Sequence, residues 1–365
     1  MTFRFAEAFV GYTAIGDTAE SDWSASSVSY NNANGRFGLG GVTVPFNSAF
    51  SRGTVPVAAV TDYVIAQFSA KWDAGTRTKE SGVIKFGNNG GAQICLSIKR
   101  MPNDSVQAWD ANGSNVGTSA PGVLTSGQWH AIVVKAQIGK AAGDIKIYVN
   151  DMVAPVLDLS SKDLLAGGAA TGCDFISWER NSFDDAAAGA QFILSELMIY
   201  DTEGVDVWSD LVGDKRLYPL QTDAYSSVSE WSPSAGINEE NVDDPLGAIH
   251  DGNGMSDTYN STIVEDVSDT FTVNPLPVGV VGIVGVISIL TAKKSDGGAE
   301  PGALYHVVQS VFTNPTFDAL RPEDDAGSLT VAYRNYQSIR VYDPNGDISW
   351  DEASVNAMRI GYLIV

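Results

Sequence analysis

The chain has 365 residues, a formal net charge of −22 and only 18% charged side chains. A surface this acidic repels nucleic-acid phosphates, so neither DNA nor RNA is an expected partner. The length is sufficient for two domains with hydrophobic cores of ordinary size.

The composition favours many short strands. Glycine occurs 37 times, aromatic residues make up 10% of the chain, and no long amphipathic helical pattern is present. Two cysteines, Cys95 and Cys173, are too few for a disulfide framework, and we expect both to be buried as small apolar residues, with a single bridge as the alternative. The segment Met1–Glu7 has no apolar signal core, which predicts folding in a cytosol.

The chain opens with an expected strand at residues 3–12 and a polar, serine-rich loop at 17–34. A glycine-rich stretch, Gly35–Gly41, follows it. Such a stretch can cradle phosphate, but here no strand-to-helix context surrounds it and no lysine follows. A bulged turn that brings the backbone close to a neighbour is therefore the favoured interpretation.

Short strand patterns follow at regular spacing, separated by Gly, Asn and Asp turns such as the one at 110–113. The expected strands cover residues 63–72, 82–87, 92–98 and 106–109. This succession predicts an antiparallel sandwich.

An antiparallel hairpin is predicted at residues 127–154. It opens with Gly-Gln-Trp-His, rises through the apolar run 131–135, turns at 139–144 and returns through 145–149. The returning arm alternates apolar and polar residues, which is typical of a strand with one buried face. We expect Trp129, at the start of the hairpin, to be buried.

This hairpin resembles the laminin-G or concanavalin-like jelly roll. In that family a Trp-His pair opens a central strand and a Tyr-Val-Asn-Gly run ends the next, although here Asp151 replaces the glycine. Residues 192–201 are similar to the closing strand of the family. The resemblance implies an all-β fold with a concanavalin-like antiparallel jelly roll at 1–204, a linker at 205–222, and a second β-sandwich, the assembly domain, at 223–365.

The second half carries another resemblance, based on the order of several short segments. It looks like a C-terminal module of tailed-bacteriophage virion proteins that begin with a concanavalin-like domain. The segments are 229–238, 242–245, 257–261 and 268–271, together with Arg4-Phe5, 35–38, and 343–346 before Ser349-Trp350. The resemblance implies localisation in a virion, with other virion proteins as partners, at a tail, baseplate or fibre position, with capsid decoration as the alternative.

An apolar run spans residues 276–292 and is followed much later by an apolar ending at 358–365. The run is rich in glycine and β-branched residues, so a strand at 278–290 buried on both faces is favoured over a membrane span. We expect no membrane insertion. A homo-oligomer, or docking on a virion neighbour, through the C-terminal domain is predicted, and packing of both strands inside a self-sufficient sandwich is the alternative.

No constellation supports catalysis. A glycoside hydrolase needs two carboxylates flanking the scissile bond, but Glu196 stands alone on its strand and Glu239-Glu240 lies in a loop. The three histidines, His130, His250 and His306, occur outside any nucleophile-elbow or zinc motif. We therefore expect a non-enzymatic protein and assign no catalytic residue and no cofactor.

No metal ligand is assigned either. The spacing Asp343-x-Asn345-x-Asp347 suits calcium, but Ile348 and Ser354 stand where a glycine and a glutamate are needed. A turn leading into a capping box from Ser349 to Glu352 is favoured. A second acidic group is interpreted as a solvated loop, with an ion site as the alternative: Asp243, Asp244, Asp251, Asn253 and Asp257.

Four tryptophans near expected loops, Trp23, Trp109, Trp178 and Trp231, are candidates for stacking on sugar rings, but no sugar site is assigned from the sequence. The favoured interpretation is a structural virion protein that works by packing and display. A carbohydrate-binding module that contacts a host-surface glycan is the alternative, and a hydrolase comes third.

Overall fold

The chain folds into two compact units, residues 1–217 and 218–365, each considered by itself below. The computed structural model describes residues 2–7, 23–26, 28–31, 35–38, 40–44, 48–52, 63–73, 79–88, 92–165, 172–180, 192–202, 216–234, 236, 260–264, 266–280, 282–294, 304–309, 316–319, 329, 334–344 and 348–364. The division at 217 lies within the stretch 205–222 that the sequence marks as a linker.

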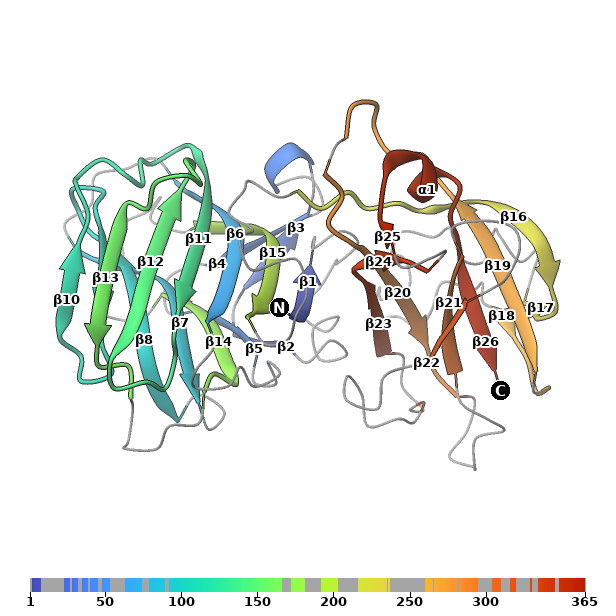
Figure 1. Cartoon of the computed structure of the whole chain (residues 1–365), viewed down its shortest axis with the longest axis horizontal. Coiled ribbons are helices and arrows are strands. Elements are labelled where there is room, and N and C mark those ends of the chain that lie inside the picture. The colour runs from blue at the N-terminus through green and yellow to red at the C-terminus, as the bar shows by residue number, and fades with distance from the viewer. Residues whose placement is uncertain are drawn as a thin grey trace. The chain divides into compact units, whose positions relative to one another are not determined.

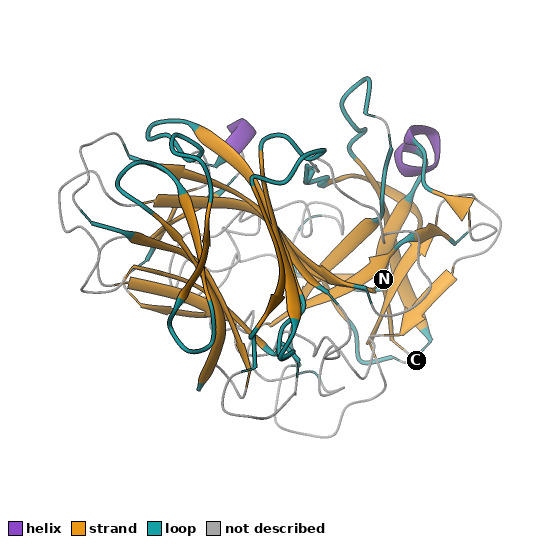
Figure 2. Ribbon diagram, turned by 60° about the vertical axis from the view of Figure 1, so that its left-hand side comes forward, coloured by secondary structure: helices purple, strands orange, loops and turns teal. Residues whose placement is uncertain are grey.

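The first unit is built from two antiparallel sheets that stack face to face (Figures 1 and 2). Sheet A has the order β13-β12-β11-β6-β15-β4-β3, and β1 also pairs with β15. Its strands are β1 (Thr2–Glu7), β3 (Ser29–Asn31), β4 (Gly41–Val44), β6 (Val64–Trp72), β11 (Trp129–Ala136), β12 (Gly143–Val149), β13 (Leu157–Lys162) and β15 (Phe192–Asp201).

Sheet B has the order β10-β9-β8-β7-β14-β5-β2. Its strands are β2 (Trp23–Ser26), β5 (Ser48–Arg52), β7 (Ser81–Asn88), β8 (Gln93–Arg100), β9 (Val106–Trp109), β10 (Asn115–Thr118) and β14 (Phe175–Arg180). Consecutive antiparallel strands in two packed sheets are the architecture of the concanavalin-like jelly roll. The strands expected from the sequence therefore form, and the expected closing strand is β15.

One hydrophobic core fills the space between the two sheets. Side chains at alternate positions supply it, since successive residues of a strand point to opposite faces. On β6 the inward positions are Val64, Ala66, Phe68, Ala70 and Trp72, all fully or nearly fully buried. On the predicted hairpin, β11 pairs with β12 in continuous register.

Trp129 differs from expectation. It is only partly buried, whereas its neighbour His130 is 2% exposed. The alternation of side chains along β11 explains this. His130 shares a face with Ile132 and Val134, which belong to the core, whereas Trp129 points to the other face. The prediction that Trp129 is buried is wrong.

The outer side of sheet A is also closed to solvent in its central strands. On β6 the outward residues Ile65, Gln67 and Ser69 are at most 3% exposed. Outward residues of the flanking strands are buried as well, namely Ala131, Val133, Met198 and Tyr200. The outward positions of sheet B, by contrast, are partly exposed on β8 and β9.

The second unit centres on a five-stranded antiparallel sheet with the order β16-β19-β26-β21-β22. Its strands are β16 (Thr222–Ser229), β19 (Val267–Val273), β21 (Leu304–Gln309), β22 (Thr316–Ala319) and β26 (Arg359–Ile364). The other elements are β17 (Ser232–Pro233), β18 (Asn260–Ser261), β20 (Val286–Ala292), β23 (Arg334–Arg340), β24 (Tyr342–Asp343), β25 (Ile348–Ser349) and helix α1 (Glu352–Asn356).

A two-stranded sheet of β20 and β23 packs on the five-stranded sheet, so the second unit is also a β-sandwich. Val286 of β20 packs against the hydrophobic cluster that contains Val308 of β21, and Leu290 packs against the cluster that contains Leu304. The Ser288 hydroxyl lies 3.0 Å from Nδ1 of the fully buried His306, which joins the two layers. His306 itself lies on β21.

Two expectations about the second unit are corrected. The strand predicted at 278–290 begins only at Val286, and the preceding residues form a loop in which Val278 is 98% exposed. Gly279 and Gly282 have φ values of +90° and +66°, which no regular strand allows. The apolar ending forms β26, which pairs with β19 on one edge and β21 on the other, so this segment packs inside its own sandwich.

The capping box also lies elsewhere than predicted. Asp351, not Ser349, caps helix α1, with its carboxylate accepting a 2.7 Å bond from the Ser354 amide. These hydrogen bonds from Ser354 lower the pKa of the Asp351 carboxyl.

In the described ranges, no helix is long and apolar enough to cross a membrane.

Candidate functional site

The glycine-rich stretch at 35–41 and Glu196, far apart in sequence, meet on the outer side of sheet A. Arg36 Nη1 donates a 3.2 Å hydrogen bond to the Ser69 hydroxyl and lies 3.7 Å from Glu196 Oε2. The Ser69 hydroxyl in turn donates to Glu196 Oε2 at 2.8 Å. The Glu196 side chain is 1% exposed, so its charge is compensated by a guanidinium and a hydroxyl rather than by water.

Two residues of this cluster have left-handed backbones. Phe37 has φ +58° and Glu196 has φ +53°, a conformation that costs energy for residues other than glycine. At Glu196 the strain coincides with a bulge, because the β15 pairing with β6 shifts between Ser195 and Met198. Bulges re-aim side chains, and this one directs Glu196 towards Ser69 and Arg36.

Phe37 carries the exposed part of the cluster. Its side chain is 53% exposed, and the Arg36 guanidinium carbon lies 4.4 Å from the ring centroid. Arg216, much later in the chain, stacks on the same ring at 3.8 Å. Arg216 is exposed and forms no ion pair with any described residue. The arrangement is an exposed aromatic ring held against two guanidinium groups, a geometry that stabilises cations and presents positive charge.

A second candidate lies on the outer side of sheet B, around Trp109 at the end of β9. Lys99 Nζ lies 3.8 Å from the Trp109 ring centroid, and Glu80 Oε1 holds the same ammonium at 2.6 Å. The Trp109 indole donates to Gln107 Oε1 at 3.2 Å, and Ser97 is its cross-strand neighbour. Because the outward side chains of β8 and β9 are partly exposed, this set is accessible; we call Glu80, Ser97, Lys99, Gln107 and Trp109 the Trp109 surface.

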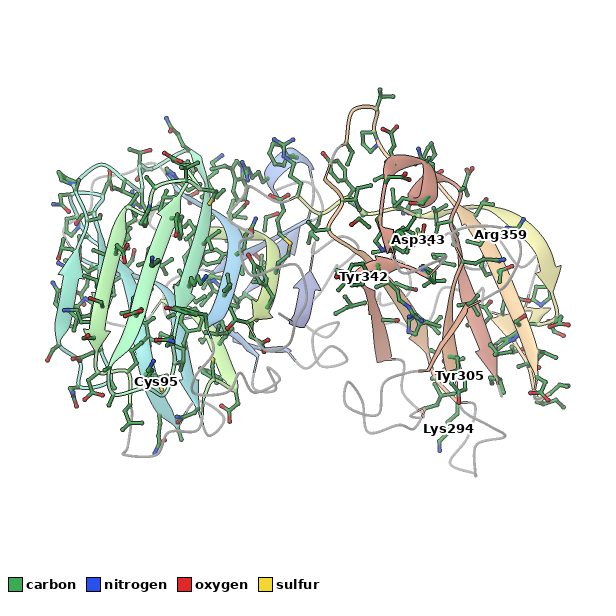
Figure 3. All side chains as sticks on the ribbon, viewed as in Figure 1. Cys95, Lys294, Tyr305, Tyr342, Asp343 and Arg359 are labelled. Carbon is green, nitrogen blue, oxygen red and sulfur yellow. The ribbon has the colours of Figure 1, made fainter. Side chains whose placement is uncertain are left out.

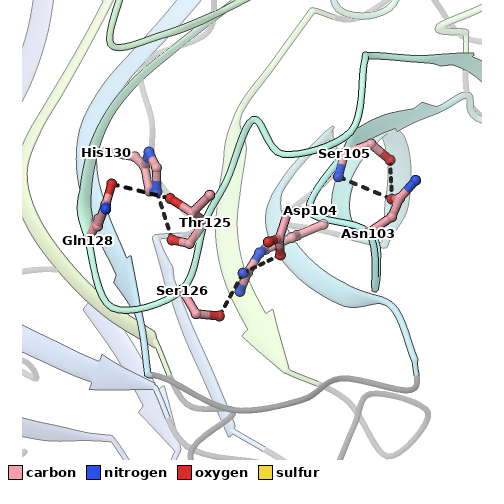
Figure 4. Close-up of polar contacts among 8 residues, drawn as sticks. Asn103, Asp104, Ser105, Thr125, Ser126, Gln128 and His130 are labelled. Carbon is pink, nitrogen blue, oxygen red and sulfur yellow. Dashed lines mark hydrogen bonds and ion pairs between the residues drawn. The ribbon is translucent and has the colours of Figure 1, made fainter.

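A polar network joins two loops at one end of the first unit (Figure 4). Arg100, the last residue of β8, is fully buried and donates from Nη2 to Asp104 at 2.5 Å and to Ser126 at 2.9 Å. Its guanidinium carbon lies 5.0 Å from the Trp72 ring centroid. Burial lowers the pKa of Arg100, and the nearby Asp104 carboxylate opposes that shift. The network holds the loops together and offers no open site.

His130 belongs to the same end of the molecule and has a structural role. Its Nε2 lies 2.9 Å from the Thr125 carbonyl, so Nε2 carries the proton, and Nδ1 accepts from the Asn150 amide at 3.1 Å. Burial lowers the pKa of His130. Both ring nitrogens are committed to the neutral form, which agrees with the structural role expected for the Trp-His motif.

The residues considered for catalysis do not converge. Glu196 is engaged by Arg36 and Ser69 as described above, while Glu239-Glu240 and His250 lie outside the described residues. Cys95 of β8 (Figure 3) and Cys173 are buried free thiols, as expected. Burial raises the pKa of Cys173 to about 12, so this thiol stays protonated and is a poor nucleophile.

The candidate calcium ligands are only partly described. Asp343 is 1% exposed in the short strand β24 (Figure 3), whereas Asn345 and Asp347 lie outside the described residues. The second acidic group, from Asp243 to Asp257, also lies outside them. Among the residues that the structure describes, no three His, Cys, Asp or Glu side chains gather as a metal site.

The four candidate tryptophans have different environments. Trp178 is fully buried and packs edge-on against Phe68 at 5.7 Å, so it is a core residue. Trp231 packs against Tyr362 at 4.6 Å and donates to the Val267 carbonyl. The side chain of Trp23 lies outside the description. Trp109 alone of the three described side chains stands on an accessible sheet face.

Asp269 brings together three of the segments that carry the second resemblance. Its Oδ1 accepts from the Glu230 and Trp231 amides at 2.7 and 3.0 Å. Its Oδ2 accepts from the Tyr362 hydroxyl at 3.2 Å and from the Asn260 amide at 3.4 Å. Asp269 is fully buried. Burial of the Tyr362 hydroxyl, and next the negative charge of Asp269, raise the pKa of Tyr362. Three of the resembling segments, 229–238, 257–261 and 268–271, therefore meet at Asp269 in the second unit.

The sequence matches no family model and no curated protein sequence. Among solved structures, the chain is similar to the cellulose induced protein Cip1, with 11% identity over 50% of this chain and 92% of that chain and a TM-score of 0.37. It is also similar to the carbohydrate recognition domain of Emp46p, with 10% identity, 55% and 98% coverage and a TM-score of 0.38. Alginate lyase vAL-1 from Chlorella virus matches with 11% identity, 50% and 95% coverage and a TM-score of 0.38. All three TM-scores lie below 0.5.

Proposed function

We propose that this chain is a non-catalytic carbohydrate-binding protein that holds a glycan on the Trp109 surface of its first unit. The observation that carries the proposal is the partly exposed indole of Trp109, fixed by Lys99 and Gln107 on an accessible sheet face. An aromatic ring supplies apolar contact for the C–H groups of a sugar, and neighbouring polar groups supply orientation.

The polar neighbours suit sugar hydroxyls because they include both donors and acceptors. Lys99 donates, Glu80 accepts, and Gln107 does both. The Lys99–Glu80 ion pair, 2.6 Å long with both side chains partly exposed, and the Trp109–Gln107 bond hold these groups in place before a ligand arrives. Such preorganisation lowers the entropic cost of binding.

The alternative location for a glycan, the outer side of sheet A, is less suitable. Its central outward residues, such as Gln67 and Ser69, are almost fully buried and bonded to protein groups. The proposal assigns no catalytic role to Glu196, because a carboxylate that holds Arg36 and Ser69 inside the protein suits a structural role better than proton transfer.

Glycan-array binding followed by calorimetry on the best ligand tests this proposal. Trp109→Ala is expected to weaken binding by about fivefold, since an aromatic contact contributes on the order of 1 kcal/mol. Tyr218→Ala, which removes an aromatic side chain 39% exposed in the second unit, is the matched control and is expected to leave binding unchanged. No binding on a broad array, or equal binding by Trp109→Ala and the unmodified chain, would overturn the proposal.

We further propose that the protein belongs to a tailed-phage virion, where it displays the binding unit and is attached through the second unit. Support comes from the sequence resemblance and from Asp269, which joins three of the resembling segments through Glu230, Trp231 and Asn260. The partners would be other virion proteins, and a homo-oligomer is part of the proposal. Cryo-EM of the particle tests it: finding this chain in no virion, or a purified monomer at micromolar concentration with no particle contact through residues 218–365, would contradict it.

A further inference from the structure

We propose that Arg36, Phe37 and Arg216 form a second binding site in the first unit, and that it takes a carboxylated sugar. This site is separate from the Trp109 surface, because Arg36 contacts the outer side of sheet A through Ser69 whereas Trp109 stands on the outer side of sheet B. The inference goes beyond the proposed function by adding a site that selects charge.

Charge is the first argument. The chain carries a net charge of −22, yet this point of its surface gathers two guanidinium groups around one ring. Glu196 compensates Arg36, but Arg216 is exposed and has no ion pair with any residue in the described part of the chain. A planar guanidinium matches the two oxygens of a carboxylate, so a carboxylate is the chemistry that Arg216 is suited to bind.

The aromatic ring is the second argument. Phe37 is 53% exposed, so its ring edge offers apolar contact to the C–H groups of a pyranose beside the charge. A site with one positive charge and one apolar surface matches a sugar that carries one carboxylate on an otherwise uncharged, C–H-rich ring.

Backbone strain is the third argument. Phe37 and Glu196, two of the six described non-glycine residues with positive φ, belong to this one cluster. The Arg36–Glu196 ion pair and the Ser69 hydrogen bonds anchor the turn that presents Phe37. Strained backbone persists only where the surrounding structure holds it in place, and it is concentrated at ligand-binding positions. Two strained residues in one cluster therefore favour a ligand site over an ordinary surface turn.

An acidic protein segment is less favoured as the ligand than a sugar. Such a segment carries several carboxylates close together, and the net charge of −22 repels a polyanion more strongly than a single carboxylate. A saccharide with one carboxylate per disaccharide places uncharged rings on either side of the contact. The experiment includes an acidic peptide so that the two ligands are distinguished.

The test measures binding of a glucuronate-containing disaccharide, and of its neutral glucose counterpart, to the full chain by calorimetry at low ionic strength. The acidic sugar is expected to bind more tightly than the neutral one. Arg216→Gln is expected to weaken only the acidic sugar, by about tenfold, because it removes one charge-assisted hydrogen-bonding group. Raising the salt concentration is expected to weaken the same contact, since the site is exposed.

The control is Lys146→Gln, which makes the same charge change at another exposed position of the first unit, where Lys146 pairs with Asp158 at 3.6 Å. It is expected to leave binding unchanged. Near-ultraviolet circular dichroism verifies that each variant is folded. Arg216 is exposed, so folding of its variant is expected.

Three outcomes would overturn the inference. One is equal affinity for the acidic and neutral sugars, and another is an unchanged affinity in Arg216→Gln. A third is tighter binding of a hexaglutamate peptide than of the acidic disaccharide, which would indicate a protein partner. Trp109→Ala separates the two proposals: acidic binding that survives it supports this second site, whereas loss of acidic binding there would place the sugar on the Trp109 surface instead.

Discussion

At the scale of single residues, the alternation of side chains along a strand predicts burial better than residue type does. Trp129 is the larger and more apolar residue, yet His130 is the one on the core side of β11, with Ile132 and Val134. The alternation within the strand already contains this information. The same alternation places Arg100 inward, after Leu96 and Ile98 on β8. What the sequence does not reveal are its partners Asp104 and Ser126, which loops bring in and which compensate the buried charge.

His130 predicts a dependence of stability on pH. Its folded pKa lies below the ordinary value near 6.5 because burial disfavours the charged form; the Arg100 charge acts in the same direction, and the Thr125 carbonyl and Asp104 oppose it. Its contribution to stability is therefore complete above the unfolded pKa and is lost as the pH falls below it. Urea unfolding at pH 7.5 and pH 5 measures this loss.

The control for this prediction is His130→Gln, which cannot titrate. The drop in unfolding free energy between the two pH values is expected to be smaller in this variant than in the unmodified chain. An equal drop in both proteins would show that other groups, such as His250 or His306, cause the pH dependence.

At the scale of elements, the alternating patterns of the first unit were sufficient to locate its central strands, because each has one face in the core. The second unit shows where this fails. An apolar run predicted a strand from Val278, but Gly279 and Gly282 adopt positive φ and delay β20 until Val286. Apolar composition alone does not reveal where glycine uses its conformational freedom. The predicted position of the helix cap was wrong for a similar reason. Ser349, Asp351 and Ser354 are all residue types that cap helices, and the sequence alone does not show that Asp351 is the one that caps α1.

Gly361 of β26 predicts a large effect from a small substitution. A Cβ at this position would lie 1.9 Å from the Asp269 carbonyl oxygen, an atom of the paired strand β19 that cannot move without breaking the sheet. Gly361→Ala is expected to lower the unfolding free energy by more than about 2 kcal/mol, measured by chemical denaturation.

Gly117→Ala in β10 is the matched comparison. Its added Cβ would meet only the side chain of Leu159, at 2.6 Å, and that side chain can rotate away. This variant is expected to lose less than about 1 kcal/mol. Equal losses in the two glycine variants would contradict the view that backbone contact sets the cost.

At the scale of the whole molecule, the all-β class and the order of the two sandwiches could be predicted from composition, strand spacing and the Trp-His motif. The candidate sites could not. Arg36, Phe37 and Arg216 meet through a left-handed turn and a chain segment far away in sequence, and no periodic pattern encodes either. Part of the Trp109 surface could be predicted, since Gln107 and Trp109 are two residues apart on one strand and therefore share a face. The positions of Lys99 and Glu80 beside them could not, because they depend on which strands are neighbours in the sheet.

The division into two units predicts that each folds alone. The first unit has a continuous core between its two sheets, and the second has cores of its own around Trp350 and Tyr362. Fragments 1–217 and 218–365 are each expected to give near-ultraviolet circular dichroism and a cooperative unfolding transition. A fragment that stays unfolded while the full chain is folded would show that the two units form one domain.

The position of β6 has a consequence for motion. This strand is paired with β11 on one edge and β15 on the other, and both of its faces are buried along nearly its whole length. Its amide protons can meet solvent only when the jelly roll opens as a whole, because no partial opening at an edge reaches them. Fraying of the outer strands is therefore expected to leave β6 intact, and the β6 amides are expected to exchange the most slowly in the first unit.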